Sequence, residues 1–228
     1  MKPAKLKYRI APEEVSSATF DLQEYNVSVV SREIYLHGYR DLEVEEEPGM
    51  EYRMATKFIK NLNLLNNQGR EPILVHQHTV GGNWNDGMAI YDAIVASISP
   101  VVILAYAHAR SMSSITFQGA SLRVMMPNAD FMVHQGTVYV EDTVLGAQTH
   151  MATCRENDET MLDIYSSKCK GSQKFHNTSK GEICKYIRRK MEEKQEWYLT
   201  AQEAVKYGFA DGVLGDKGLK NIDALRRA

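Results

Sequence analysis

The chain has 228 residues, of which 43% are apolar and 25% are charged, and its formal net charge is −2. This length and composition are typical of one soluble globular domain with a sizeable core. A charge so close to zero supplies no broad field to attract nucleic acid or an anionic membrane, so we expect neither as a partner. The longest apolar run, residues 101–107, is about a third of a membrane span, and the first residues lack the apolar run of a signal peptide.

The cysteines favour a reducing compartment. Cys154, Cys169 and Cys184 are odd in number and too far apart for a Cys-x-x-Cys metal or redox motif. Such cysteines are typical of reduced thiols that pack as small apolar groups. We therefore expect a cytoplasmic protein.

The predicted elements begin after a long N-terminal segment. Residues 1–26 show no periodicity and contain two prolines and several charges, so we expect a flexible arm. Residues 33–37 are predicted to form a strand that stops at Gly38. An acidic segment at 43–47 is then expected as a loop.

Apolar periodicity predicts a series of helices and strands in the rest of the chain. Helices are predicted at residues 50–65, 88–98, 112–118, 145–170, 181–195 and 201–207. Strands are predicted at residues 73–75, 101–105, 131–133 and 136–141. The run at 101–105 is apolar throughout, as expected for a strand buried on both faces. Strands that alternate with helices argue for an α/β fold.

Ser111 is the first candidate for chemistry, because it follows a buried strand and a short turn and opens a predicted helix. The unpaired N–H groups and partial positive charge of a helix N-terminus favour an anion that develops nearby. A serine there has oxyanion donors beside it. Taken alone, this placement is more typical of an ordinary helix N-cap, a position that serine favours.

Two further features change that balance. Gly81 and Gly82 form a tight turn after a strand, where the lack of side chains lets a substrate backbone approach closely. His134 lies at the end of a predicted strand, 23 residues after Ser111. A glycine pair or a lone histidine is weak evidence by itself, since most such residues are structural. Together with Ser111 they favour a serine–histidine pair.

In this order, the motifs resemble those of the Clp protease proteolytic-subunit family. The resemblance covers residues 27–214, with residues 215–228 as a C-terminal tail. The first two motifs are Gly81-Gly82 and Gly-Met-Ala-Ile-Tyr-Asp at 87–92. The next two contain the serine and the histidine: Arg-Ser-Met at 110–112, where the family has Ala-Ser-Met, and Pro-Asn-Ala-Asp-Phe-Met-Val-His-Gln at 127–135, where the family has Pro-Asn-Ser-Arg-x-Met-x-His-Gln. The last is Glu-Trp-Tyr-Leu-Thr-Ala at 196–201, where the family has an acid two residues before Phe-Leu-Ser/Thr-Ala.

The resemblance implies a fold, an activity and a set of site residues. The fold would be the α/β Clp/crotonase-like spiral of repeated β-β-α units, with a helical handle region near residues 142–195. Ser111 would be the nucleophile and His134 its base in peptide-bond hydrolysis. The backbone N–H groups of Gly82 and Met112 would hold the oxyanion.

The third member of the triad maps to Glu196, where the family usually has Asp. Glu192 and Glu193 lie one helical turn earlier, and either could serve instead. The alternative for all three is a solvated charged face.

Departures from the family also concern the nucleophile and the handle. Arg110 replaces a small residue, and it could point into solvent, bind a substrate carboxylate or obstruct the pocket. Ser113 replaces the usual glycine. The segment between His134 and Glu196 is longer than usual, around residues 170–179, and in the family this region forms the handle by which two rings stack.

By resemblance, the protein is a serine endopeptidase that cuts unfolded polypeptides inside an oligomeric chamber. The family implies a seven-membered ring of copies of the chain, possibly stacked in pairs, and an AAA+ ATPase partner that unfolds the substrate. ATP would belong to that partner, since the chain lacks a phosphate-binding Gly-x-x-x-x-Gly-Lys-Ser/Thr motif and is expected to carry no cofactor.

Several alternatives remain open at this point. A crotonase-type acyl-CoA enzyme would share the fold and the oxyanion hole without a serine–histidine pair. A non-catalytic ring subunit would have its site blocked by Arg110. A serine–lysine peptidase is disfavoured, because no lysine lies near the required motif. His76 and His78 could bind a metal from one strand face, but two polar strand residues near the substrate groove are the more common case, so no metal is expected.

Overall fold

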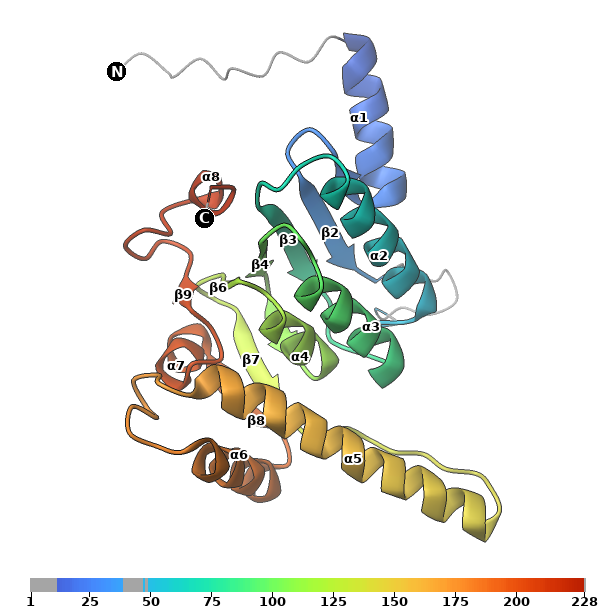
Figure 1. Ribbon diagram of the computed structural model, residues 1–228, viewed down its shortest axis with the longest axis vertical. Helices are drawn as coiled ribbons and strands as arrows, with labels where there is room; N and C mark the ends of the chain where they lie inside the picture. The colour runs from blue at the N-terminus through green and yellow to red at the C-terminus, as the bar shows by residue number, and fades with distance from the viewer. Residues whose placement is uncertain (1–11, 39–46, 48, 228) are drawn as a thin grey trace.

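The structure is a computed structural model that describes residues 12–38, 47 and 49–227, and Figure 1 shows how its elements are arranged. The helices are α1 (Pro12–Tyr25), α2 (Tyr52–Asn66), α3 (Trp84–Val95), α4 (Met112–Gln118), α5 (Val144–Cys169), α6 (Lys180–Lys194), α7 (Ala201–Tyr207) and α8 (Ile222–Leu225). The strands are β1 (Val27–Ser28), β2 (Glu33–His37), β3 (Ile73–His78), β4 (Val101–Ala105), β5 (His108–Arg110), β6 (Leu122–Met125), β7 (Asp130–Val133), β8 (Trp197–Thr200) and β9 (Gly212–Val213).

The strands form two sheets. The larger has the order β1-β2-β3-β4-β6-β9 and is parallel except for the β1–β2 pair, and the smaller has the order β5-β7-β8. Consecutive strands go to different sheets: β4 is followed by β5 and then α4, and β6 by β7 and then α5. This repeated β-β-α unit confirms the predicted α/β Clp/crotonase-like spiral.

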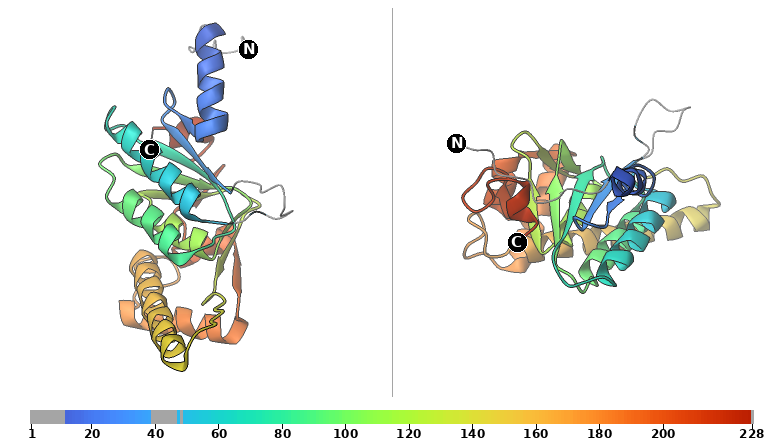
Figure 2. Two further views of the ribbon diagram at one scale, coloured as in Figure 1. Left: turned by 90° about the vertical axis from the view of Figure 1, so that its right-hand side faces the viewer. Right: turned by 90° about the horizontal axis from the view of Figure 1, so that it is seen from above.

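The apolar run that forms β4 is buried on both faces, as its sequence predicts. Val101, Ile103 and Ala105 belong to the main core, which also contains buried residues of α2, α3 and α4. The alternate residues Val102 and Leu104 belong to a second cluster on the opposite face. Figure 2 shows α2 and α3 side by side along one face of the large sheet.

The expected C-terminal tail closes that second cluster. Its helix α8 places Leu225, which is fully buried, against the cluster, and the side chain of Arg226 donates from Nε to Glu33 Oε1 at 2.6 Å. Burial opposes the ionisation of Glu33, but the neighbouring His76 imidazole and Arg226 guanidinium outweigh it and lower the pKa of Glu33 to about 2. The segment is therefore part of the folded domain, because the sheet face would otherwise expose its apolar residues.

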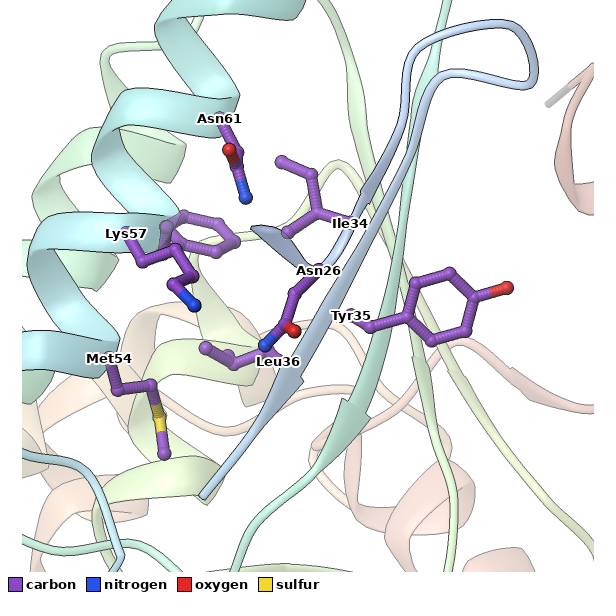
Figure 3. A pocket seen from close by; sticks show the side chains of 8 residues that line it. Asn26, Ile34, Tyr35, Leu36, Met54, Lys57 and Asn61 are labelled. Carbon is purple, nitrogen blue, oxygen red and sulfur yellow. The ribbon is translucent and has the colours of Figure 1, made fainter. Parts of the chain in front are cut away.

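The expected N-terminal arm contains helix α1, where the sequence shows no periodicity. Two side chains of α2 hold the end of this helix: Lys57 Nζ donates to the carbonyl of Glu24 at 2.7 Å, and Asn61 Nδ2 donates to that of Tyr25 at 2.6 Å. Both side chains line a small pocket between α2 and β2 (Figure 3). The side chain of Tyr35 points away from α2, to the other side of β2. Residues 1–11 lie outside the described part of the chain.

The acidic loop expected at 43–47 lies mostly outside the described residues, since only Glu47 is described. Its carboxylate accepts hydrogen bonds from the backbone N–H groups of Gly38 at 3.1 Å and of Val80 at 2.9 Å. Glu47 therefore links the end of β2 to the turn that carries the glycine pair.

The strand predicted at residues 136–141 is wrong. This segment has no regular structure, and Gly136 has a left-handed backbone with φ 81°. In Figure 1 it runs beside α5 rather than beside a strand. A strand needs a neighbour that pairs with its backbone groups, and no strand of the described chain pairs with this segment.

The handle region consists of α5 and α6, which pack against each other. The buried residues of α5 all belong to its C-terminal half, from Met161 to Cys169, whereas Val144 and Leu145 at its start are 79% and 73% exposed. The first half of α5 thus projects away from the two sheets (Figure 1). Within the described ranges, no helix is long and apolar enough to cross a membrane.

Candidate active site

Ser111 and His134 lie side by side because their strands are parallel neighbours. Ser111 follows the last residue of β5 and His134 follows the last residue of β7. The register pairs Arg110 with Met132, so the two strands end at the same edge. The result is a distance of 2.7 Å between Ser111 Oγ and His134 Nε2, which is a hydrogen bond.

The backbone of Ser111 is strained. Its φ is 50° and its ψ is −131°, a conformation that non-glycine residues rarely adopt and that is common at functional sites. The serine N–H donates to the carbonyl of Met132 at 3.2 Å, and Ser114 Oγ donates to the serine carbonyl at 2.6 Å. The Ser111 side chain makes no capping hydrogen bond to α4. The N-cap interpretation is therefore wrong, and the hydroxyl is directed to His134 instead.

The glycine pair packs against the chain's own backbone. A Cβ added to Gly81 would lie 2.8 Å from the backbone nitrogen of Met112 and 2.8 Å from the Cβ of Ser111. Gly82, with φ 144°, forms an isolated bridge with Met50. Gly81 is thus required for the close approach of the turn to the nucleophile, and Gly82 for its close approach to the Met50 backbone, in addition to any contact with substrate.

Gly82 and Met112 are the residues predicted to hold the oxyanion. Both line the cleft that contains Ser111 and His134. In the part of the chain that the structure describes, no backbone carbonyl accepts a hydrogen bond from either N–H. Unpaired donors beside a nucleophile are what a developing oxyanion needs.

The cleft over Ser111 has a volume of about 550 Å³. Its walls come from the glycine turn, the start of α4, the segment after β7 and the inner side of α5. The residues that line it are Gly82, Asn83, Trp84, Asn85, Ser111, Met112, Ile115, His134, Gln135, Gly136, Thr137, Val138, Tyr139, His150, Thr153, Cys154, Asn157, Asp158 and Met161. Arg110 is not one of them.

Arg110 is held away from the cleft by two contacts. Its Nε donates to Asp130 Oδ1 at 2.6 Å, and its Nη2 donates to Asp130 Oδ2. The guanidinium carbon lies 5.2 Å from the centroid of the Tyr198 ring. None of the three roles considered from the sequence describes this arrangement, and the blocked-site alternative loses its basis. The partner could have been found only from the pairing of β5 with β7, which places residues 110 and 130 on adjacent strands.

Ser113, the other departure beside the nucleophile, stabilises the same turn. Its hydroxyl donates to the Arg110 carbonyl at 2.7 Å and accepts from the Arg110 N–H at 2.8 Å. Ser113 is fully buried. A glycine would lack both hydrogen bonds.

Glu196 is the carboxylate that stands beside His134. Its Oε1 lies 3.9 Å from His134 Nδ1, which is close enough for an ion pair but too long for a hydrogen bond. Its Oε2 accepts a hydrogen bond from the Tyr198 hydroxyl at 3.0 Å, a contact that the sequence interpretation missed. The Glu196 side chain is 51% exposed and that of His134 is 20% exposed.

Glu192 and Glu193 lie elsewhere. Glu193 accepts from Lys190 Nζ at 2.7 Å and forms a second ion pair with Arg189, and both glutamates are exposed on α6. The solvated-face interpretation therefore describes these two residues, whereas Glu196 is exposed but also lies beside His134.

The surroundings of His134 favour its neutral form. Burial lowers the pKa of the imidazole, and the negative charge of Glu196 opposes part of that effect. A neutral imidazole with its Nε2 on a serine hydroxyl can accept the hydroxyl proton.

His76 and His78 lie in different surroundings. His76 is buried, stacks on Tyr35 with 4.4 Å between ring centroids, and bonds the Tyr106 hydroxyl through Nδ1 at 2.9 Å. His78 is exposed, and neither histidine lines the cleft. Among residues 12–38, 47 and 49–227, no group of three His, Cys, Asp or Glu side chains is arranged to hold a metal ion.

Comparison with known proteins identifies the family of the chain. The sequence model of the family described as Clp protease matches residues 31–217. The chain is 26% identical over 187 residues to the ATP-dependent Clp protease proteolytic subunit of Deinococcus radiodurans. The aligned region covers 81% of this chain and 85% of that relative. The proteins of the same name from Streptococcus salivarius and Streptococcus thermophilus are 27% and 28% identical over 199 residues, covering 83% of this chain and 93% of each relative. The chain therefore belongs to the Clp protease family.

Proposed function

We propose that this peptidase of the Clp family cuts peptide bonds with Ser111 as nucleophile and His134 as general base. The observation that carries the proposal is the 2.7 Å hydrogen bond between Ser111 Oγ and His134 Nε2, at the floor of the cleft. Oγ attacks the scissile carbonyl while Nε2 takes its proton and then delivers it to the leaving amine. Water releases the acyl group by the same two proton transfers.

The remaining roles follow from the charges that develop. The oxyanion is stabilised by the backbone N–H groups of Gly82 and Met112. The imidazolium that forms on His134 is stabilised by the negative charge of Glu196, which also favours the tautomer with hydrogen on Nδ1. This tautomer leaves Nε2 free to accept the serine proton.

Covalent labelling tests the assignment of the nucleophile. Intact-mass spectrometry after treatment with a fluorophosphonate should show one added phosphonyl group on the wild-type chain and none on Ser111→Ala. Ser167→Ala is the matched control, because this exposed serine of α5 donates to the Asp163 carbonyl of its own helix and does not line the cleft. Labelling of Ser111→Ala to the wild-type extent would refute the assignment.

The lowered pKa of His134 predicts the pH dependence of the reaction. The base must be neutral, so kcat/KM should fall as pH drops through the pKa of His134. Because that pKa lies below the ordinary value of 6.5, the acid limb of the profile should lie below pH 6.5, with a plateau at neutral pH. The measurement is kcat/KM for a short fluorogenic peptide between about pH 4.5 and 8. An acid limb centred above pH 7 would contradict it.

We further propose that copies of the chain assemble into a seven-membered ring, with or without a second stacked ring, around a chamber that receives unfolded polypeptides. The family membership and the exposed apolar start of α5 support assembly. An AAA+ ATPase would unfold the substrates and use the ATP, and the free thiols support a cytoplasmic location. Native mass spectrometry at micromolar concentration tests the ring, and a clean monomer would count against it.

The alternative activities receive less support. An acyl-CoA enzyme of crotonase type does not need a serine hydroxyl bonded to a histidine, which this site has. In a serine–lysine peptidase a lysine would reach the serine, but no lysine of the described chain lines the cleft.

A further inference from the structure

The Glu196 carboxylate needs a fixed orientation to stabilise His134, and its own place in the chain restrains that orientation little. The side chain is 51% exposed. It follows Gln195, which has φ 63° and ends the helix α6. An exposed glutamate has several rotamers of similar energy in water, and ordering it costs conformational entropy. Some other group must therefore hold the carboxylate.

The Tyr198 hydroxyl holds it. This hydroxyl donates to Glu196 Oε2 at 3.0 Å, and no other side chain within the described ranges donates a hydrogen bond to the carboxylate. Along β8, Trp197 and Leu199 are buried whereas Tyr198 is 47% exposed. Because strand side chains alternate between faces, residues 196 and 198 share one face. The hydrogen bond occupies Oε2 and leaves Oε1 toward the imidazole.

The pairing of β7 with β8 aligns this carboxylate with His134. The two strands are antiparallel, and Tyr198 pairs with Met132. Two residues further along, the same register places Glu196 opposite His134. Directly opposed side chains have Cβ atoms about 5 Å apart, so they interact. The sheet thus sets the approach of the acid, and the tyrosine sets its orientation.

Arg110 restrains the Tyr198 ring from across the sheet. Its register partner on β7 is also Met132, so Arg110, Met132 and Tyr198 form one row over three strands. The guanidinium lies 5.2 Å from the ring centroid, where a cation and an aromatic ring attract each other. Both Asp130 oxygens accept from the guanidinium, and such a bidentate pair fixes its plane.

We propose that Tyr198 is a positioning residue for the acid of the triad: its hydroxyl holds the Glu196 carboxylate opposite His134, while the Arg110–Asp130 ion pair holds its ring. The inference rests on the triad proposed above. Partial burial and the hydrogen bond to Glu196 raise the pKa of Tyr198, so the phenol stays protonated and donates at neutral pH. All four positions, 110, 130, 196 and 198, are ones at which the sequence departs from the family motifs.

Tyr198→Phe tests the proposal, because it removes one oxygen and keeps the ring. We expect kcat for a fluorogenic peptide to fall about tenfold with KM unchanged, which is the effect of losing one hydrogen bond to a charged group. A less ordered Glu196 stabilises the imidazolium less, so the acid limb of the pH profile should move to lower pH. In the Glu196→Gln background, the same change should have no further effect.

Tyr35→Phe is the matched control. The Tyr35 hydroxyl donates to Glu33 Oε2 at 3.3 Å with the same Glu-x-Tyr spacing, on a strand that does not line the cleft. This variant should keep the wild-type kcat and pH profile. Circular dichroism of both variants checks that the fold is retained.

Three results would overturn the proposal. Wild-type kcat and pH profile in Tyr198→Phe would show that the hydroxyl does not position the acid. An equal loss in the Glu196→Gln background would show that Tyr198 acts without Glu196. A faster variant would show that the hydroxyl competes with His134 for the carboxylate. Fluorophosphonate labelling separates these from failure of the proposed function: an unlabelled wild-type chain refutes the serine–histidine assignment itself.

Discussion

Ser111→Ala and His134→Ala should each reduce peptide hydrolysis to the background of the assay, a loss of about 10⁵-fold or more in kcat. Each variant removes one of two side chains that act together through the 2.7 Å hydrogen bond. The double mutant should therefore be hardly slower than either single mutant. The measurement is kcat for a short fluorogenic peptide, so that no partner ATPase is needed.

Matched substitutions distinguish this effect from damage to the fold. Ser167 and His176 are exposed residues of the same types, and neither lines the cleft, so their alanine variants should keep wild-type activity. Ser111→Ala should also keep its secondary structure and its native mass. Near-wild-type activity in Ser111→Ala, or losses that multiply in the double mutant, would contradict the assignment.

Glu196→Gln should lower kcat/KM by at least about a hundredfold, because an amide can neither stabilise the imidazolium nor enforce the Nδ1–H tautomer. The same loss of charge should move the acid limb to lower pH, since Glu196 opposes the effect of burial on the pKa of His134. Glu196→Asp should be milder because it keeps the charge. It should still be slower than wild type, since the distance to Nδ1 is already 3.9 Å and the shorter side chain loses reach.

Glu192→Gln and Glu193→Gln are the controls for this prediction. Both residues are exposed on α6 and should be nearly silent. Full activity in Glu196→Gln together with a loss in either of these variants would assign the acid elsewhere, while the Ser111–His134 pair would stand.

Much of the fold could be predicted from the sequence because its signals are local. The helix at residues 112–118 and the strand at 33–37 have the observed bounds, and the long helix of the handle differs by one residue at each end. Apolar periodicity and the glycine that ends α7 depend only on the chain nearby. The strand β4 could be predicted equally well, since a short run that is apolar at every position is typical of a strand buried on both faces.

Which segments pair or pack with one another depends on tertiary structure and could not be predicted from these local signals. Residues 136–141 have the composition of a strand, but no strand of the described chain lies beside them to complete the hydrogen bonds. Helix α1 lacks an apolar stripe, and its last carbonyls are bonded by Lys57 and Asn61 of α2. Likewise the position of α8 depends on the second face of the large sheet, against which its residue Leu225 packs.

The site divides in the same way. Ser111 and His134 were predicted from sequence, because a serine after a buried strand, a glycine pair and a histidine at a strand end occur in the order of the family motifs. The orientation of Glu196 was not, because it depends on the Tyr198 hydroxyl and on a register between β7 and β8 that only the assembled sheet defines. The sequence by itself predicted Ser111 as nucleophile, His134 as base and the α/β fold. Tertiary structure decided that Arg110 pairs with Asp130 and leaves the cleft open, because two opposite charges on adjacent strands bind each other when the strands pair.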